Sequence, residues 1–270
     1  MHLPALVLIA TIATVKAGVT LEKRAVTLFT PNGKFDYQLG GAYTPPSGTV
    51  TVVRDRTAAV APNLYNICYI NAFQTQPNEN DFWKTNHDEV LLRNSTGQYF
   101  IDPGWPDEIQ FNTTTAQNRN TIAGVLNGWI DECATNGFKG IEPDNLDTFT
   151  RSDNLLTKEN NFALAALIAT HAHNANLAIA QKNLAEFSSE AKAAAGFDFT
   201  VAEECQAETE CEEYTAVYGD FVLEIEYTDR DDPEEIFQDA CAARGTEYSI
   251  ILRDRFLVTP SEPDYHYEEC

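Results

Sequence analysis

About eight short apolar runs, the later ones separated by helical patterns, most constrain how this 270-residue chain can fold. Runs rich in β-branched and aromatic residues and bounded by turn residues are typical of buried strands. No break in composition divides the chain, and no internal repeat is present. The candidate strands are Tyr37–Leu39, Val50–Val53, Asn66–Ala72, Gly140–Asp144, Leu177–Gln181, Phe197–Glu203, Phe221–Tyr227 and Tyr248–Leu252.

Helical patterns fill the longer gaps between the later runs. Apolar residues recur at helical spacing over Ala116–Asn136, before the stop signal Gly137. Thr157 is a candidate N-cap for a helix that ends near His173, and Pro233 suits the first turn of another helix. Strands that alternate with helices pair in parallel, and about eight of them favour closure. We therefore expect an α/β fold, a single-domain (β/α)8 barrel of the TIM type.

The first residues have the pattern of a secretory leader. The run 3–15 is apolar but too short to cross a bilayer, and small residues follow it. A dibasic Lys23-Arg24 site of the kind cut during secretion comes next. We expect residues 1–17 to be a signal peptide, 18–24 a short propeptide, and 25–270 the barrel of a secreted, extracellular protein.

The charge of the chain restricts its partners. It carries 41 acidic and 18 basic side chains, a formal net charge of -23. Such a field repels nucleic acids and anionic membranes, and we expect neither as a partner. It would attract a cationic polymer such as a chain of amino sugars, although an acidic surface also serves solubility alone.

Six cysteines follow the leader, an even number that indicates disulfide bonds in a secreted protein. Fifteen pairings are open at this point. A zinc site is the competing interpretation, but the chain has no C-x-x-C motif and no histidine at ligand spacing from a cysteine. Asn94 and Asn112 begin N-glycosylation sequons, which agrees with the secretory route.

Acidic residues end several of the predicted strands, where a barrel of this type builds its active site. Asp144, Glu203 and Glu226 are among them, and Lys182 follows another strand. Carboxylates crowded at one barrel mouth raise one another's pKa, so protonated and ionised groups coexist there. Glycoside cleavage requires such a pair of acids. The alternatives are a solvated rim of ion pairs, or a divalent cation bound by Asp144, Asp147 and Glu203.

The segment 75–104 is long and weakly periodic, and we expect it to cross the barrel mouth.

Several motifs in order resemble one family. The string Gly140–Asp147 resembles the G-x-x-P-D-N-x-D signature of glycoside hydrolase family 114, the endo-α-1,4-polygalactosaminidases. The resemblance covers about 35–270. Its further motifs are Arg54–Arg56, Tyr65–Tyr69, Gln181–Asn183, Phe197–Cys205, Glu210–Cys211, Glu224–Tyr227, Ile251–Arg255 and Cys270.

The resemblance implies a (β/α)8 barrel that acts on α-1,4-linked polymers containing galactosamine. It carries the family's catalytic aspartate and glutamate over to Asp144 and Glu203. We expect Asp144 to be the nucleophile and Glu203 the acid/base of a retaining enzyme, with carboxyl groups roughly 5 Å apart. No metal or other cofactor is expected. The disulfides expected are Cys205–Cys211, Cys241–Cys270 and Cys68–Cys133.

Further residues are candidates for substrate binding beside the catalytic pair. Lys182 would temper the negative field and keep a carboxylate ionised, and Trp105 is a further aromatic candidate. Packing in the core or support of the catalytic pair are the alternatives for these side chains. The candidates are Tyr37, Gln38, Tyr69, Asp147, Lys182, Glu224, Glu226 and Tyr227.

The resemblance thus predicts an endo-acting hydrolase of galactosamine-containing polysaccharide, which we expect to be a monomer. Two rival functions stay open at this point. One is a carbohydrase for another α-glycan, and the other is a non-catalytic sugar-binding or cell-wall protein on the same barrel.

Overall fold

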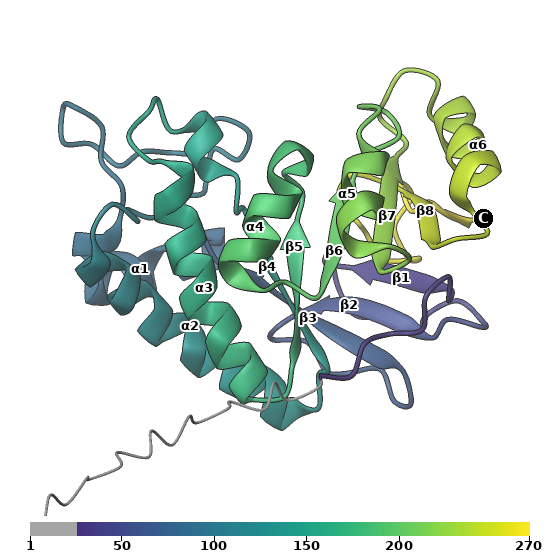
Figure 1. Ribbon diagram of the computed structural model, residues 1–270, viewed down its shortest axis with the longest axis horizontal. Helices are drawn as coiled ribbons and strands as arrows, with labels where there is room; N and C mark the ends of the chain where they lie inside the picture. The colour runs from purple at the N-terminus through teal and green to yellow at the C-terminus, as the bar shows by residue number, and fades with distance from the viewer. Residues whose placement is uncertain (1–25) are drawn as a thin grey trace, which may run out of the picture.

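The computed structural model describes residues 26–270, whose nine strands form one curled sheet (Figure 1). The strands are neighbours in chain order, and each pairs in parallel with the next, except that the ninth is antiparallel to the eighth. All eight predicted runs form strands, and the ninth was not predicted. The bounds are β1 Phe35–Gln38, β2 Thr51–Asp55, β3 Tyr65–Asn71, β4 Gly140–Asp144, β5 Ala178–Lys182, β6 Phe199–Glu203, β7 Val222–Tyr227, β8 Ser249–Arg253 and β9 Tyr267–Glu269.

The curled sheet brings β8 beside β1. The Ser249 hydroxyl on β8 donates a hydrogen bond to the backbone carbonyl of Gly33 at 2.7 Å. At the other end of β8, the Arg253 guanidinium donates to the carbonyl of Tyr37 and to the Asp36 carboxylate. The fold is the predicted single-domain (β/α)8 barrel of TIM type.

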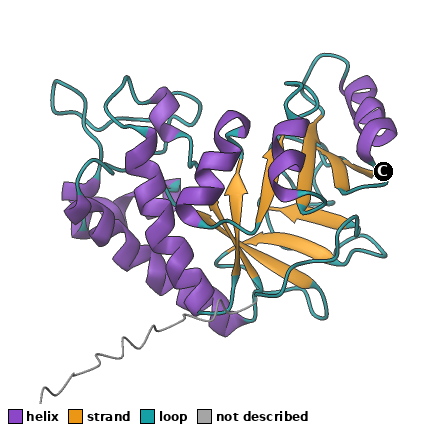
Figure 2. Ribbon diagram, in the orientation of Figure 1, coloured by secondary structure: helices purple, strands orange, loops and turns teal. Residues whose placement is uncertain are grey.

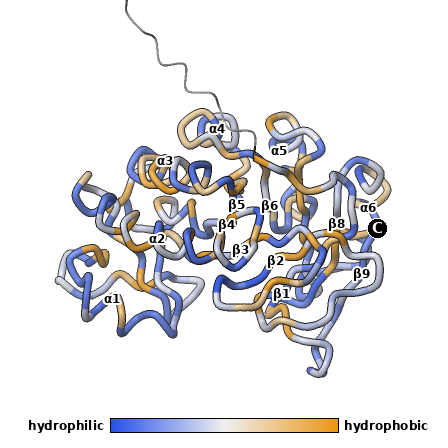
Figure 3. Tube along the Cα trace, turned by 90° about the horizontal axis from the view of Figure 1, so that it is seen from below, coloured by the Kyte–Doolittle hydropathy of each residue, from blue (hydrophilic) through white to orange (hydrophobic). Residues whose placement is uncertain are grey.

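Residues alternate between the barrel interior and its outer layer, as the pleat of a strand requires. The interior holds side chains such as Phe35, Val201 and Ile225. Intervening residues such as Ile141 and Ala202 pack outward with the helices. Figure 3 shows hydrophobic stretches along the strands and largely hydrophilic loops at the periphery. This alternation decides which strand-end side chains reach the barrel mouth.

Six α-helices lie outside the sheet in the described residues (Figures 1 and 2). The predicted helix ends are confirmed for α2, which Gly137 ends in a left-handed conformation, and for α3, where Thr157 forms a capping box. Pro233 begins α6, also as predicted. Three shorter helices were not predicted. The bounds are α1 Asn80–Asn86, α2 Ala116–Asn136, α3 Lys158–Asn174, α4 Ser188–Ala195, α5 Cys211–Tyr218 and α6 Pro233–Arg244.

Loops instead of helices connect the first three strands, over 39–50 and 56–64. The outer side of this part of the barrel is polar and internally hydrogen-bonded. Arg54 on β2 donates to the Gln38 side chain and to the carbonyls of Tyr43 and Ala59. These hydrogen bonds satisfy the buried Arg54 guanidinium. Around the other strands, helices cover the sheet with apolar residues instead.

All three predicted disulfides are present. Cys68–Cys133 joins β3 to α2, Cys205–Cys211 closes the loop between β6 and α5, and Cys241–Cys270 ties the end of the chain to α6. The expected signal peptide and propeptide lie outside the described residues. Within 26–270, no helix combines the length and apolar character needed to cross a membrane.

Candidate active site

A pocket of about 430 Å³ opens at the carboxyl ends of the barrel strands. This is the edge where the loops of a TIM-type barrel carry its chemistry. The segment 75–104 contributes to the pocket wall, as its predicted course over the barrel mouth requires. The lining residues are Tyr37, Leu39, Gly40, Tyr69, Gln76, Asp102, Gly104, Trp105, Glu108, Asp144, Asn145, Asp147, Arg151, Lys182, Asn183, Glu203, Tyr227, Arg255, Phe256 and Leu257.

Asp144 is the last residue of β4, and its carboxylate is held from three sides. Its Oδ2 accepts a hydrogen bond from the Tyr69 hydroxyl at 2.7 Å, and its Oδ1 accepts from the Asn145 backbone at 2.8 Å. Burial raises the pKa of Asp144, but the Lys182 ammonium and these two hydrogen bonds outweigh burial and hold that pKa below its ordinary value. Asp144 is therefore ionised at neutral pH.

Glu203 ends β6 and is fixed by two side chains. Its Oε1 accepts from the Tyr227 hydroxyl at 2.5 Å, and its Oε2 accepts from the Asn183 amide at 3.0 Å. The Asn183 carbonyl oxygen accepts in return from the Glu203 backbone N–H at 2.8 Å. This reciprocal pair of bonds fixes the Glu203 side chain relative to its own strand.

Lys182 ends β5, between the strands of the two acids, and its side chain is only 2% exposed. Its ammonium nitrogen lies 3.3 Å from Asp144 Oδ1 and 3.3 Å from Glu203 Oε2. Asp144 Oδ1 and Glu203 Oε2 can thus lie at most twice 3.3 Å apart. The carboxylates face each other across one buried cation, and 18% and 24% of their side-chain areas stay exposed to the pocket.

Glu142 lies below this pair on the same inward face of β4, with its side chain fully buried. Its Oε1 is 3.0 Å from the Lys182 nitrogen and accepts from the Tyr37 hydroxyl at 2.6 Å. Burial raises the pKa of Glu142 to about 7, Lys182 lowers it, and the Asp144 charge raises it. Glu142 was not among the predicted site residues. Its place two residues before Asp144 puts both side chains on one face of the strand.

The three predicted tyrosines hold carboxylates, and their rings are largely buried. Tyr37, Tyr69 and Tyr227 donate to Glu142, Asp144 and Glu203 respectively. Burial and then the neighbouring carboxylates raise the pKa of each phenol well above its ordinary value. The phenols therefore stay protonated as donors, and each orients one acid.

One wall of the pocket is built around Arg151. Its guanidinium lies 2.6 Å from Asp147 and 2.6 Å from Asp102. Asp147 was predicted and reaches the pocket, but its carboxylate is already paired. Trp105 lines the same pocket and is 48% exposed, so its ring face is available to a ligand. The long segment between β3 and α2 also brings Glu108, which was not predicted.

Arg255, after β8, also lines the pocket and binds Glu204 and Asp229. Phe256 follows and is 73% exposed, the highest fraction among the exposed large hydrophobic residues of 26–270. Phe256 and Trp105 thus both line the pocket that holds the carboxylate pair. Aromatic rings in such positions can stack on the apolar faces of sugar rings.

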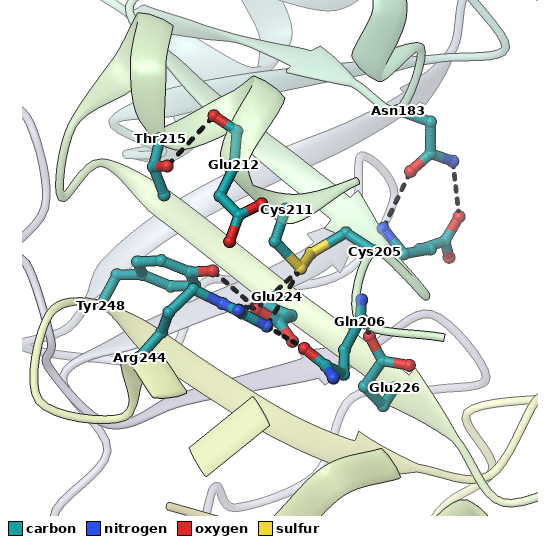
Figure 4. Close-up of a disulfide and its surroundings, with 11 residues drawn as sticks. Asn183, Cys205, Gln206, Cys211, Glu212, Thr215, Glu224, Glu226, Arg244 and Tyr248 are labelled. Carbon is teal, nitrogen blue, oxygen red and sulfur yellow. Dashed lines mark hydrogen bonds and ion pairs between the residues drawn. A yellow bond between two sulfur atoms is a disulfide. The ribbon is translucent and has the colours of Figure 1, made fainter. Parts of the chain in front are cut away.

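Two predicted site residues on β7 do not reach the pocket. Glu224 and Glu226 are 0% and 1% exposed, and they point to the side of the sheet opposite Tyr227. Figure 4 shows Glu224 beside Tyr248 and Arg244; the Tyr248 hydroxyl donates to it at 2.8 Å. Their predicted contact with substrate does not fit this placement, because strand alternation turns them to the outer layer.

Gln38 likewise lies outside the pocket lining. It is 1% exposed, donates to Asp36 at 2.7 Å, and accepts from Arg54 at 2.9 Å. Its neighbour Tyr37 points inward, so Gln38 must point outward. Gln38 therefore belongs to the polar outer layer of β1 and β2.

The three acids of the cation alternative have ion-pair partners within the protein. The ammonium of Lys182 lies between Asp144 and Glu203, and Arg151 binds Asp147. In the described residues these three acids do not form a group with mutually close ligand atoms. Protein cations already lie next to each of these three carboxylates.

Comparisons with known proteins agree with this architecture. The model of glycoside-hydrolase family GH114 matches residues 18–270. Ega3 of Aspergillus fumigatus, in a complex with galactosamine, has a TM-score of 0.71 and 20% identity over 92% of this chain and 100% of its own. The glycoside hydrolase domain of PelA from Pseudomonas aeruginosa has a TM-score of 0.54 and 13% identity, covering 84% of this chain and 96% of its own.

A third solved structure is an α-galactosidase from Thermus thermophilus in complex with p-nitrophenyl α-D-galactopyranoside. It has a TM-score of 0.51 and 11% identity over 87% of this chain and 61% of its own. No curated protein matches the sequence. At these identities, the solved structures establish a shared barrel fold.

Proposed function

The chain belongs to glycoside hydrolase family GH114, and from this premise we propose that it is an endo-acting hydrolase of α-1,4-linked, galactosamine-containing polysaccharide. Asp144 and Glu203 are the catalytic pair. The observation that carries the proposal is the position of both carboxylates, each 3.3 Å from the Lys182 nitrogen at the barrel mouth.

Their roles are those of the two acids in a retaining double displacement. Asp144 is ionised and attacks the anomeric carbon, while Glu203 donates its proton to the departing glycosidic oxygen. Water then attacks the glycosyl–Asp144 ester; Glu203 takes its proton, and the Asp144 carboxylate is released. Retaining enzymes hold the two groups about 5–5.5 Å apart, and inverting enzymes about 6.5–9.5 Å. The shared lysine favours the shorter spacing.

Two observations support the substrate class. Ega3, which shares the fold, was crystallised with galactosamine. The chain also has a formal net charge of -23, and an acidic field attracts a polymer that carries ammonium groups. The fold shared with an α-galactosidase keeps a neutral α-galactoside as the second candidate substrate.

Incubation with purified α-1,4-linked galactosaminogalactan tests the proposal. We expect the parent protein to release oligosaccharides detectable by mass spectrometry, and Asp144→Asn to slow release at least about a thousandfold because the nucleophile is lost. Proton NMR of the first product should show the α-anomer. If the parent cleaves only neutral α-galactosides, the second candidate is correct; binding without turnover by the parent would indicate a sugar-binding protein.

Secretion is part of the same proposal. The leader pattern of residues 1–17, the dibasic site at Lys23-Arg24 and the three disulfides support it. Processing would leave a mature chain that starts near Ala25, with N-glycans at Asn94 and Asn112. Amino-terminal sequencing and peptide mapping of the secreted protein would test these sites.

A further inference from the structure

Glu108 is the pocket-lining carboxylate that lacks a protein cation. The other acids of the pocket in residues 26–270 are paired: Asp144 and Glu203 with Lys182, and Asp102 and Asp147 with Arg151. No ion pair within the described residues involves Glu108. Its charge is therefore left for something outside the protein.

The carboxylate is held in one orientation by two amides. Its Oε2 accepts from Asn71 at 2.8 Å and from Gln74 at 2.7 Å. Its Oε1 accepts no hydrogen bond within residues 26–270, and it is not among the buried unsatisfied atoms, so it remains accessible in the pocket. One oxygen is thus fixed by the protein and the other is open to a ligand.

Hydrogen bonds place this open oxygen near the proposed nucleophile. The Asn71 side-chain oxygen Oδ1 accepts from the Asn145 side-chain amide at 2.9 Å, and the Asn145 backbone N–H donates to Asp144 at 2.8 Å. Two asparagines therefore connect Glu108 with Asp144. When one sugar unit is bound over Asp144, that unit or the next unit of the polymer therefore lies beside Glu108.

Burial makes the unpaired carboxylate costly to ionise. It raises the pKa of Glu108 to about 7, the two amides lower it, and the charges of Asp144 and Asp102 raise it. A ligand with a positive charge beside Oε1 would relieve this cost, whereas a neutral ligand would not. An ammonium group, with three hydrogen-bond donors, fits the open oxygen.

We propose that Glu108 is a specificity-determining residue that binds the ammonium group of a de-N-acetylated galactosamine unit next to the cleavage point. An N-acetyl group at the same carbon offers no positive charge to Glu108 and is bulkier. The protein therefore prefers the free amine. This inference rests on the proposed function and assigns its substrate preference to one residue.

The test compares Glu108→Gln with Asp107→Asn. Glutamine keeps an oxygen for the bonds from Asn71 and Gln74 while it removes the charge. Asp107 is the preceding residue; it is exposed and does not line the pocket, so its variant matches the change in net charge. Thermal unfolding checks that both variants fold.

Calorimetry measures binding of a galactosamine tetramer and of its N-acetylated counterpart. We expect Glu108→Gln to weaken binding of the amine form by roughly 10- to 100-fold, since a charge-assisted bond is lost, and to change binding of the acetylated form less than about twofold. Asp107→Asn should change neither. Equal weakening of both ligands, or no weakening, would overturn the assignment.

Cleavage of the two polymers by the same variants separates this inference from the proposed function. If the parent cleaves the polymer and Glu108→Gln cleaves both forms with unchanged preference, the specificity role alone is refuted. If the parent cleaves neither, the proposed function is wrong. Selective binding of the amine tetramer would then still support Glu108, and absence of that binding would overturn it.

Discussion

Strands β4 and β7 carry nearly the same acidic motif, but its side chains point into the barrel on β4 and toward the outer layer on β7. On β4, Glu142 and Asp144 point inward and share the Lys182 ammonium. On β7, Glu224 and Glu226 point outward, where Arg244 lies 3.7 Å from Glu224. The sequences E-P-D and E-I-E differ little, yet a single step in strand alternation separates them.

Asp144 and Glu226, the last acid of each motif, differ in protonation accordingly. The Lys182 ammonium and two hydrogen bonds hold the pKa of Asp144 below its ordinary value despite burial. In the outer layer, burial and then the Glu224 charge raise the pKa of Glu226 to about 8. A buried acid is therefore available as a nucleophile only where a cation is placed beside it. Glu226, which forms no ion pair within residues 26–270, instead belongs to the hydrogen-bonded outer layer.

Replacing the cation beside each set of acids should have the largest effect on this difference. Replacing Lys182 by Met removes the cation that lowers the pKa of Asp144 and Glu142, so the pKa of Asp144 rises and Asp144 becomes protonated. We expect kcat/KM at neutral pH to fall roughly 10²- to 10³-fold, with partial recovery as pH rises and Asp144 ionises again. A pH–rate profile of the purified variant measures both effects.

Arg244→Met is the matched control on the outer side. It removes the cation beside Glu224 and should lower the melting temperature while kcat/KM stays within about threefold of the parent. A loss of activity comparable to that of Lys182→Met would mean that the outer acids serve catalysis, and the distinction between the two faces would fail.

The sequence alone predicts where the strands lie, but not which of their side chains point into the barrel. The eight runs and the three longest helices were located, since hydrophobic period and capping residues are local signals. Tyr227 and Glu226 were both assigned to the site, although adjacent strand residues cannot point the same way. Applying the alternation that makes Asp144 face inward would have excluded Glu226 and added Glu142.

Other features carry no local signal. The helices α4 and α5 have eight residues each, too few for a clear period, and β9 has three. Glu108 and Asp102 lie on a segment held by isolated bridges such as Gln74–Gln110, which depend on contacts distant in sequence. The tertiary structure therefore determines the position of each of these acids in the pocket.

Glu142 allows a subtler test, of intermediate expected size. Burial raises its pKa to about 7, so it is neutral below that pH and adds a negative charge beside Lys182 above it. We expect the parent to show a change in kcat of several-fold, up to about tenfold, across neutral pH as this charge appears. Glu142→Gln mimics the protonated form and should abolish the change.

Glu226→Gln is its counterpart on β7. Its pKa is also raised, to about 8, but its carboxylate points away from the pocket. The pH–rate profile of this variant should follow that of the parent. If Glu142→Gln retains the inflection while Glu226→Gln loses it, the titrating group lies on the outer face.

The smallest expected effect is on stability, and it comes from the same outer glutamate. Because the folded-state pKa of Glu226 is raised to about 8, its protonated form stabilises the fold fully below the unfolded-state pKa, and that contribution disappears as pH rises through about 8. Glutamine in its place cannot ionise. The melting temperature of Glu226→Gln relative to the parent should therefore increase by roughly 2–4 °C between pH 7 and pH 8.5. Calorimetric melting curves measure this, with the exposed Glu212→Gln as control. A difference that stays constant with pH would show that Glu226 is already ionised in the outer layer, and the contrast with Asp144, which Lys182 keeps ionised, would lose its physical basis.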